Sequence, residues 1–201
     1  MRARTTAVIG TALAMAAIVG SGPVSAQTLT TKDAAGDVVV WSSKTQTSSE
    51  RSTAVDILST RVRYDNGSLV VKTRFRDLTK TNTTITAKVT SLHNYWFDTD
   101  PERRGYEYNI HDARGENLHR ARPGADRRIP CQGLTWKPDL STNVTTLVVP
   151  RSCFAKSQRR AVRVKFSILQ TGPGRAPAGG GSYFLDTMED TIRSATVRYG
   201  G

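Results

Sequence analysis

The stretch 55–75, VDILSTRVRYDNGSLVVKTRF, decides the fold. It contains two runs in which apolar and polar residues alternate, with the two-residue period of a half-buried β-strand. The segment Asp65–Ser68 (DNGS) joins the two runs. Asn-Gly between alternating runs is a strong signal for a β-hairpin with a type I′ turn, in which both central residues have positive φ. The stretch therefore predicts two antiparallel strands joined by a two-residue loop.

A two-residue loop determines which residues face each other across the hairpin. The predicted core face pairs Tyr64 with Leu69, Val62 with Val71, Thr60 with Thr73 and Leu58 with Phe75. The opposite face pairs Arg63 with Val70, Arg61 with Lys72, Ser59 with Arg74 and Ile57 with Arg76. One face is thus apolar, and the other gathers the cations Arg61, Arg63, Lys72, Arg74 and Arg76.

The rest of the chain is also rich in strand patterns and nearly free of helix patterns. Further strands are expected at 37–41, 85–97, 106–110, 134–136, 144–149, 161–169, 183–185 and 195–199. The apolar residues of 85–97 change phase, which predicts a bulge or bend near Ser91. Many short strands at regular spacing favour an all-β fold, a two-sheet antiparallel β-sandwich of the jelly-roll kind. We place this domain at 37–201, after a flexible lead-in over 27–36.

The first residues have the layout of a secretory signal peptide. Arg2 and Arg4 precede an uncharged, Ala-rich stretch at 7–20, and Val24–Ala26 resembles an A-x-A cleavage site. The apolar stretch is shorter than the roughly 20 residues that span a bilayer. We predict a signal peptide over 1–26 that is cleaved after Ala26, a secreted protein, and no transmembrane segment in the mature chain.

The chain has two cysteines, Cys131 and Cys153. In an exported protein such a pair most simply forms one disulfide. A pair of metal ligands or a catalytic thiol is the alternative, although neither cysteine has a histidine nearby and no C-x-x-C motif occurs.

The composition is strongly basic, with 29 Lys and Arg against 17 Asp and Glu, a formal net charge of +12. Loss of Arg2 and Arg4 with the signal peptide would leave 27 basic residues. A basic surface attracts polyanions such as teichoic acids, anionic lipid headgroups, nucleic acid or acidic polysaccharides. Specific DNA recognition is not expected, because the sequence has no helix-turn-helix or zinc-finger pattern. A solvated face without a ligand is the alternative interpretation.

Four short motifs occur in an order that resembles the layout of family 9 carbohydrate-binding modules and DOMON-like sandwiches. They are Asp56-Ile57, Leu69–Val71, Tyr95–Asp100 and Gly105–Tyr108. The layout is also similar to that of a group of small secreted actinobacterial proteins, and the resemblance covers residues 37–169. The resemblance implies a β-sandwich that binds a sugar or haem, usually without catalysis. Sugars would be held by aromatic stacking, and haem by axial Met and His ligands; the mature chain would have one methionine, Met188.

Candidate ligand and metal residues lie around one charged turn and two tryptophans. Asp98, Asp100 and Glu102 alternate, as oxygen ligands for calcium could, although a turn neutralised by Arg103 and Arg104 would look the same. We otherwise expect no cofactor. Trp96 and Trp136 are candidates for sugar stacking, and core packing is the alternative.

Catalysis has one candidate carboxylate. Glu107 could act as a general acid with Asp98 or Asp100. His93, His111 and His119 match no zinc pattern, and no Gly-x-Ser-x-Gly motif is present. We therefore expect no enzyme but a secreted β-sandwich module that binds a cell-envelope glycan or another polyanion through Arg61, Arg63, Lys72, Arg74 and Arg76. The alternatives are a secreted glycan hydrolase or lyase using Glu107 and a nearby Asp, and an inert structural or interaction protein.

Overall fold

A computed structural model describes residues 26–36, 38–42, 47–52, 56–83, 90–99, 105–111, 117–121, 127–171, 182–187 and 196–198. The strands are β1 (Gln27–Lys32), β2 (Val38–Ser42), β3 (Thr47–Ser52), β4 (Ile57–Tyr64), β5 (Ser68–Phe75), β6 (Thr90–Asp98), β7 (Tyr108–Ile110), β8 (Leu118–Arg120), β9 (Arg127–Ile129), β10 (Thr135–Asp139), β11 (Val144–Pro150), β12 (Ala161–Thr171), β13 (Ser182–Thr187) and β14 (Thr196–Arg198). The short helices are α1 (Lys80–Thr83), η2 (Arg151–Cys153) and η3 (Lys156–Gln158). None of the helices in these ranges is long and apolar enough to cross a membrane. Residues 1–25 of the predicted signal peptide lie outside the described residues.

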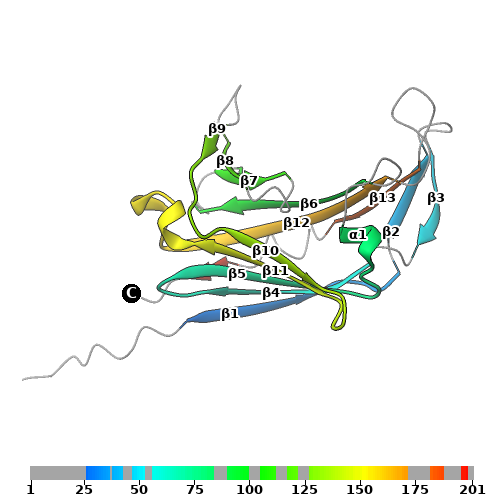
Figure 1. Cartoon of the computed structure of the whole chain (residues 1–201), viewed down its shortest axis with the longest axis horizontal. Coiled ribbons are helices and arrows are strands. Elements are labelled where there is room, and N and C mark those ends of the chain that lie inside the picture. Colours follow the sequence, from blue (N-terminus) through cyan, green and yellow to red (C-terminus); the bar gives the residue numbers. More distant parts are fainter. Residues whose placement is uncertain are drawn as a thin grey trace, which may run out of the picture.

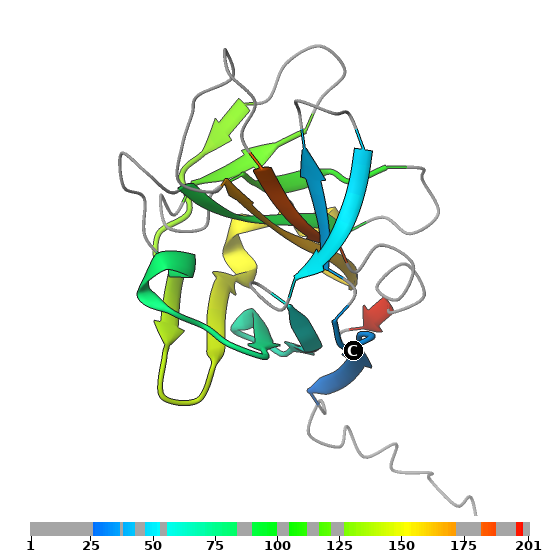
Figure 2. The same ribbon diagram turned by 90° about the vertical axis from the view of Figure 1, so that its right-hand side faces the viewer.

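These strands form two antiparallel sheets, which lie one above the other in Figure 1 and in the turned view of Figure 2. Within the described residues, the first sheet has five strands in the order β1-β4-β5-β11-β10. The second has nine, in the order β3-β2-β13-β12-β6-β7-β8-β9, with β14 paired to β12. Aromatic rings meet between the sheets, with Phe75 of β5 against Phe166 of β12 and Trp136 of β10 against His93 of β6. The predicted all-β sandwich is confirmed.

The predicted disulfide is also confirmed. Cys131 and Cys153 are bonded, with their Cα atoms 5.2 Å apart, and both pack against the core. The bond joins the segment before β10 to η2, which follows β11. The cysteines are therefore neither metal ligands nor a free thiol.

The central hairpin has the predicted register over most of its length. Tyr64 pairs with Leu69, and Arg61 pairs with Lys72. The register shifts between Ile57 and Ser59, so that Ile57 pairs with Phe75 in place of Leu58. This β-bulge corrects the prediction at the open end of the hairpin, because one extra residue in β4 moves Ile57 to the core face. Strict alternation in the sequence cannot reveal such an insertion.

The hairpin turn differs from the type I′ prediction. Neither Asn66 nor Gly67 is among the described residues with positive φ. The Oδ1 atom of Asp65 instead accepts hydrogen bonds from the backbone N–H groups of Gly67 at 3.0 Å and Ser68 at 2.9 Å. An aspartate side chain that mimics a backbone turn stabilises the bend without left-handed residues.

Three further predictions about strands are wrong. The segment Gln27–Lys32, expected to be a flexible lead-in, is β1 and pairs with β4. Its threonines favour extended backbone, and Leu29 packs against the core. Thr47–Ser52, which is not among the predicted strands, is β3 beside β2. β6 pairs with β12 from Thr90 to Asp98 in unbroken register, so these residues hold no bulge near Ser91. Residues 85–89 of the predicted strand lie outside the described residues.

The turn between β10 and β11 contains Asn143, whose φ of 56° lies in the left-handed region. Its side chain accepts a hydrogen bond from Leu78 N at 3.1 Å and donates one to Arg76 O at 3.3 Å. Asn143 thus ties this turn to the chain that leaves β5. Left-handed backbone costs an ordinary L-residue such as alanine about 1–2 kcal/mol, and asparagine adopts it more readily.

We predict that Asn143→Ala lowers the free energy of unfolding by about 2–3 kcal/mol, through backbone strain and two lost hydrogen bonds. Asn143→Gly also removes the side-chain hydrogen bonds, but glycine adopts left-handed backbone without strain. It should therefore lower the free energy of unfolding by less than the alanine variant does. Urea denaturation of the three proteins would measure the order. Equal losses for glycine and alanine would show that the backbone conformation is not a source of the effect.

Candidate functional site

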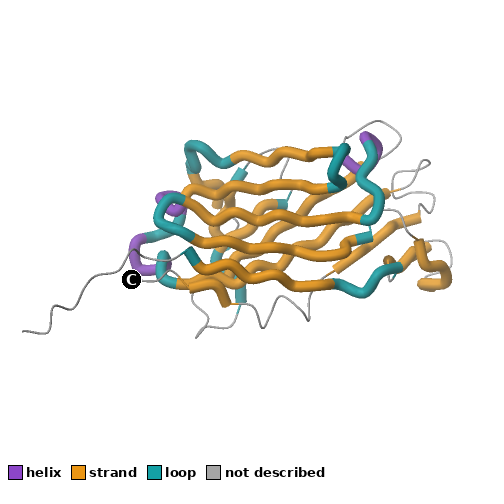
Figure 3. Tube along the Cα trace, turned by 90° about the horizontal axis from the view of Figure 1, so that it is seen from below, coloured by secondary structure: helices purple, strands orange, loops and turns teal. Residues whose placement is uncertain are grey.

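The outer face of the five-stranded sheet carries the cations that the hairpin pattern predicts. Side chains alternate along β4 and β5, so residues such as Val62 and Val71 point into the core, and their neighbours point to solvent. Figure 3 shows this sheet in front, with its strands lying side by side. The exposed cations of the hairpin are Arg61, Arg63, Lys72 and Arg74.

Neighbouring strands widen this surface. β1 places Lys32 opposite Ser59 and Thr30 opposite Arg61. On the other side, β11 places Thr146 opposite Lys72, and β10 places Lys137 opposite Thr146. We call the set Lys32, Arg61, Arg63, Lys72, Arg74 and Lys137 the basic face. Lys32 and Lys137 were missed in the sequence because the positions of β1 and β10 in the sheet depend on long-range pairing.

Two of the five predicted cations, Arg76 and Arg63, form ion pairs with carboxylates. Arg76 Nε lies 2.8 Å from Asp56 Oδ2, and Asp56 is fully buried. Arg76 therefore balances a core carboxylate at the end of β5. Arg63 Nη2 lies 3.2 Å from Asp65 Oδ2, in a pair that is partly exposed on both sides.

The middle of the basic face has no such partner. Within the described residues, no carboxylate pairs with Arg61, Lys72 or Arg74. Arg61 lies directly opposite Lys72, and like charges in this position destabilise a sheet. A hollow of about 130 Å³, open to solvent, is lined by Arg61, Arg63, Val70 and Lys72. An anion in this hollow would reduce the repulsion between the two strands.

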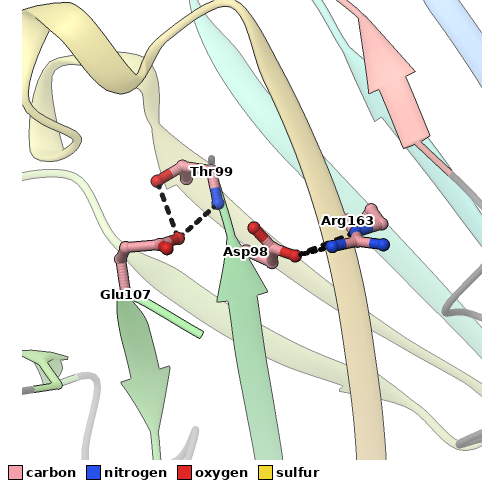
Figure 4. Close-up of polar contacts among 4 residues, drawn as sticks. All are labelled: Asp98, Thr99, Glu107 and Arg163. Atoms are coloured by element: carbon pink, nitrogen blue, oxygen red, sulfur yellow. Dashed lines mark hydrogen bonds and ion pairs between the residues drawn. The ribbon is translucent and has the colours of Figure 1, made fainter. Parts of the chain in front are cut away.

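The candidate catalytic carboxylates hold β6 to its two neighbours in the other sheet, β7 and β12 (Figure 4). Glu107 Oε2 accepts a hydrogen bond from Thr99 N at 2.7 Å and lies 3.3 Å from Thr99 Oγ1. Asp98 is buried and forms an ion pair with Arg163, which reaches across from β12. Both carboxylates thus have structural partners.

The other candidate ligands are placed as follows. Asp100 and Glu102 of the predicted calcium loop lie outside the described residues, as does Met188. Among the residues described, no group of three or more His, Cys, Asp or Glu side chains could hold a metal ion.

The two candidate tryptophans occupy different environments. Trp136 is 8% exposed, and its ring centroid lies 4.8 Å from that of His93 in the core. Trp96 is on the outer face of the nine-stranded sheet, where Lys165 Nζ lies 5.0 Å from its ring centroid. Trp136 is therefore a core residue, whereas Trp96 lies on the surface of its sheet with Lys165 over its ring.

Other clusters of arginine in the sequence are partly structural. Arg159 donates hydrogen bonds to Phe154 O at 2.7 Å and Ser152 O at 3.0 Å, and Arg163 pairs with Asp98. Arg127 and Arg128 on β9 are exposed and belong to the nine-stranded sheet, away from the basic face.

Comparisons with protein-family models, with curated proteins and with solved structures find no match to this chain. The basic face is therefore interpreted from its own geometry and charge.

Proposed function

We propose that this protein is a secreted, non-catalytic β-sandwich module that binds a polyanion of the cell envelope, a glycan or another polymer, through the basic face. The observation that carries the proposal is the placement of Arg61 directly opposite Lys72 on an exposed sheet surface, with no described carboxylate paired to either. Cross-strand repulsion of this kind is a cost of folding that a bound anion offsets.

The overall charge of the chain supports the same conclusion. Without residues 1–26, the chain keeps 27 basic residues against 17 acidic ones, a net charge of +10. This charge raises the local concentration of polyanions around the protein, and a flat face with several cations adds short-range contacts. The proposal therefore needs neither a deep pocket nor a cofactor.

The alternative of a glycan hydrolase or lyase receives less support. Such an enzyme would use Glu107 as a general acid, but the Glu107 carboxylate accepts a hydrogen bond from the backbone of Thr99. Its candidate partner Asp98 is buried against Arg163. These contacts explain both carboxylates as structural groups at the ends of β6 and β7.

The test compares two triple variants of the mature chain that change the net charge equally. One is Arg61→Glu, Lys72→Glu and Arg74→Glu on the basic face. The control is Arg127→Glu, Arg128→Glu and Lys156→Glu, at positions that are exposed outside that face. We expect the wild type and the control to stay on heparin or purified cell wall until about 0.5 M salt, where charges are screened within a few ångströms. The basic-face variant should elute below about 0.2 M salt.

Circular dichroism and thermal unfolding would verify that both variants are folded. Equal loss of retention in the two variants would mean that net charge alone drives binding, and the proposed site would be rejected. Hydrolysis or cleavage of a glycan that disappears in Glu107→Gln would support the enzyme alternative instead.

A further inference from the structure

We infer that the basic face binds one linear chain of oxyanion groups, laid along the staggered line Arg74, Lys72, Arg61, Arg63. The inference rests on the proposed function and adds the shape and chemistry of its ligand. It means that the protein recognises repeated charges and not the rings of a neutral sugar.

The register of β4 and β5 determines this line. Residues two apart in a strand are about 7 Å apart, and paired residues on adjacent strands are about 5 Å apart. Arg74 and Lys72 are two apart on β5, Lys72 faces Arg61, and Arg61 and Arg63 are two apart on β4. The four Cα positions therefore extend over about 14 Å, which is more than one oxyanion can contact.

The line of cations ends at Arg63 on one side and at Arg74 on the other. Beyond Arg63, the turn carries Asp65, whose Oδ2 lies 3.2 Å from Arg63. Beyond Arg74, the next cation is Arg76, which is held by buried Asp56. A bound chain would meet the Asp65 carboxylate past Arg63 and an already paired guanidinium past Arg74, so the line ends at these residues along the strands. Lys32 and Lys137 lie to its sides.

The residues beside the line suit oxyanions and not sugar rings. Thr30 faces Arg61 from β1, and Thr146 faces Lys72 from β11, so hydroxyl groups flank the centre of the line. Val70 lines the hollow between the arginines. Among the described residues that share this outer face on β1, β4, β5, β11 and β10, none is aromatic. Stacking, which would hold a neutral glycan, has no platform here.

Phosphodiester, sulfate and carboxylate groups share the chemistry that this line would recognise. Arginine supplies paired N–H donors that match any of them, and the threonine hydroxyls can donate to their oxygens. The probes therefore are polyphosphate, heparin and polygalacturonate, with dextran as the neutral control. The polymer that binds most tightly identifies the kind of oxyanion.

The experiment measures affinity against ligand length and against salt, with the mature chain in solution. We expect long polyphosphate to bind at least about 100-fold more tightly than inorganic phosphate, because several contacts act together. The slope of log K against log salt should be about −3, since each cation engaged contributes somewhat less than one. Arg74→Gln and Arg61→Gln should each reduce the slope by about 1, and Lys156→Gln should leave it unchanged.

Binding of inorganic phosphate as tightly as polyphosphate would overturn the inference and leave a single-anion site in the hollow. A slope that does not respond to Arg74→Gln, or binding of dextran, would also overturn it. In these cases the basic face could still bind its ligand as proposed. Failure of every polyanion to bind would reject the proposed function itself, and the inference with it.

Discussion

Replacement of Arg76 by methionine is expected to destabilise the protein by about 3 kcal/mol, the low end of the range for breaking a buried ion pair. The carboxylate of Asp56 is fully buried, and its Oδ2 accepts hydrogen bonds from Arg76 Nε at 2.8 Å and Gly36 N at 2.9 Å. Methionine fills similar space but leaves the buried charge with one neutral donor. We use the low end of the range for buried ion pairs because the Arg76 side chain is 41% exposed, so solvent screens part of the interaction.

The same variant should keep its retention on heparin, because Arg76 is already neutralised by Asp56. Urea denaturation gives the stability, and salt elution gives the binding. The double variant Asp56→Asn with Arg76→Met removes the buried charge and should recover part of the lost stability. If Arg76→Met kept full stability but lost retention on heparin, Arg76 would be a binding residue and not a structural one.

Loss of the disulfide is expected to cost about 3 kcal/mol in the chain-entropy description of a loop this long. Cys131 and Cys153 are 22 residues apart, and the loop between them contains β10 and β11. A loss of this size corresponds to a decrease of roughly 6–12 °C in the melting temperature for a domain of this length. The double variant Cys131→Ser with Cys153→Ser, compared with the oxidised wild type, would measure it.

The reducing agent alone offers a control for the serine substitutions. Reduced wild type and the double serine variant should melt at the same temperature, because both lack the cross-link. If the reduced protein melted at the same temperature as the oxidised form, the disulfide would not contribute to the stability of the fold.

The hairpin shows why part of this site can be read from the sequence. Successive side chains in a strand point to opposite faces, and the short loop sets the register near the turn. Arg61 therefore falls opposite Lys72 in any fold that contains this hairpin. The register near the turn is as predicted although the turn is not of type I′, because Asp65 closes a bend of the same length.

Other features depended on partners far along the chain. The bulge at Ile57, the pairing of Arg76 with Asp56, and the positions of Lys32 and Lys137 beside the hairpin leave no local pattern. The core position of Trp136 also has no local signal, because the pattern of a short strand does not show whether its tryptophan is exposed or buried.

The local pattern alone predicts a hairpin with its apolar and cationic side chains on opposite faces, because the period of a strand is a local property of the backbone. The three-dimensional fold was needed to show which cations have no carboxylate partner among the described residues, which hydroxyl groups border them and where the line of charge ends. Those outcomes depend on the order of strands in the sheet and on buried contacts between distant segments, which short-range patterns do not specify.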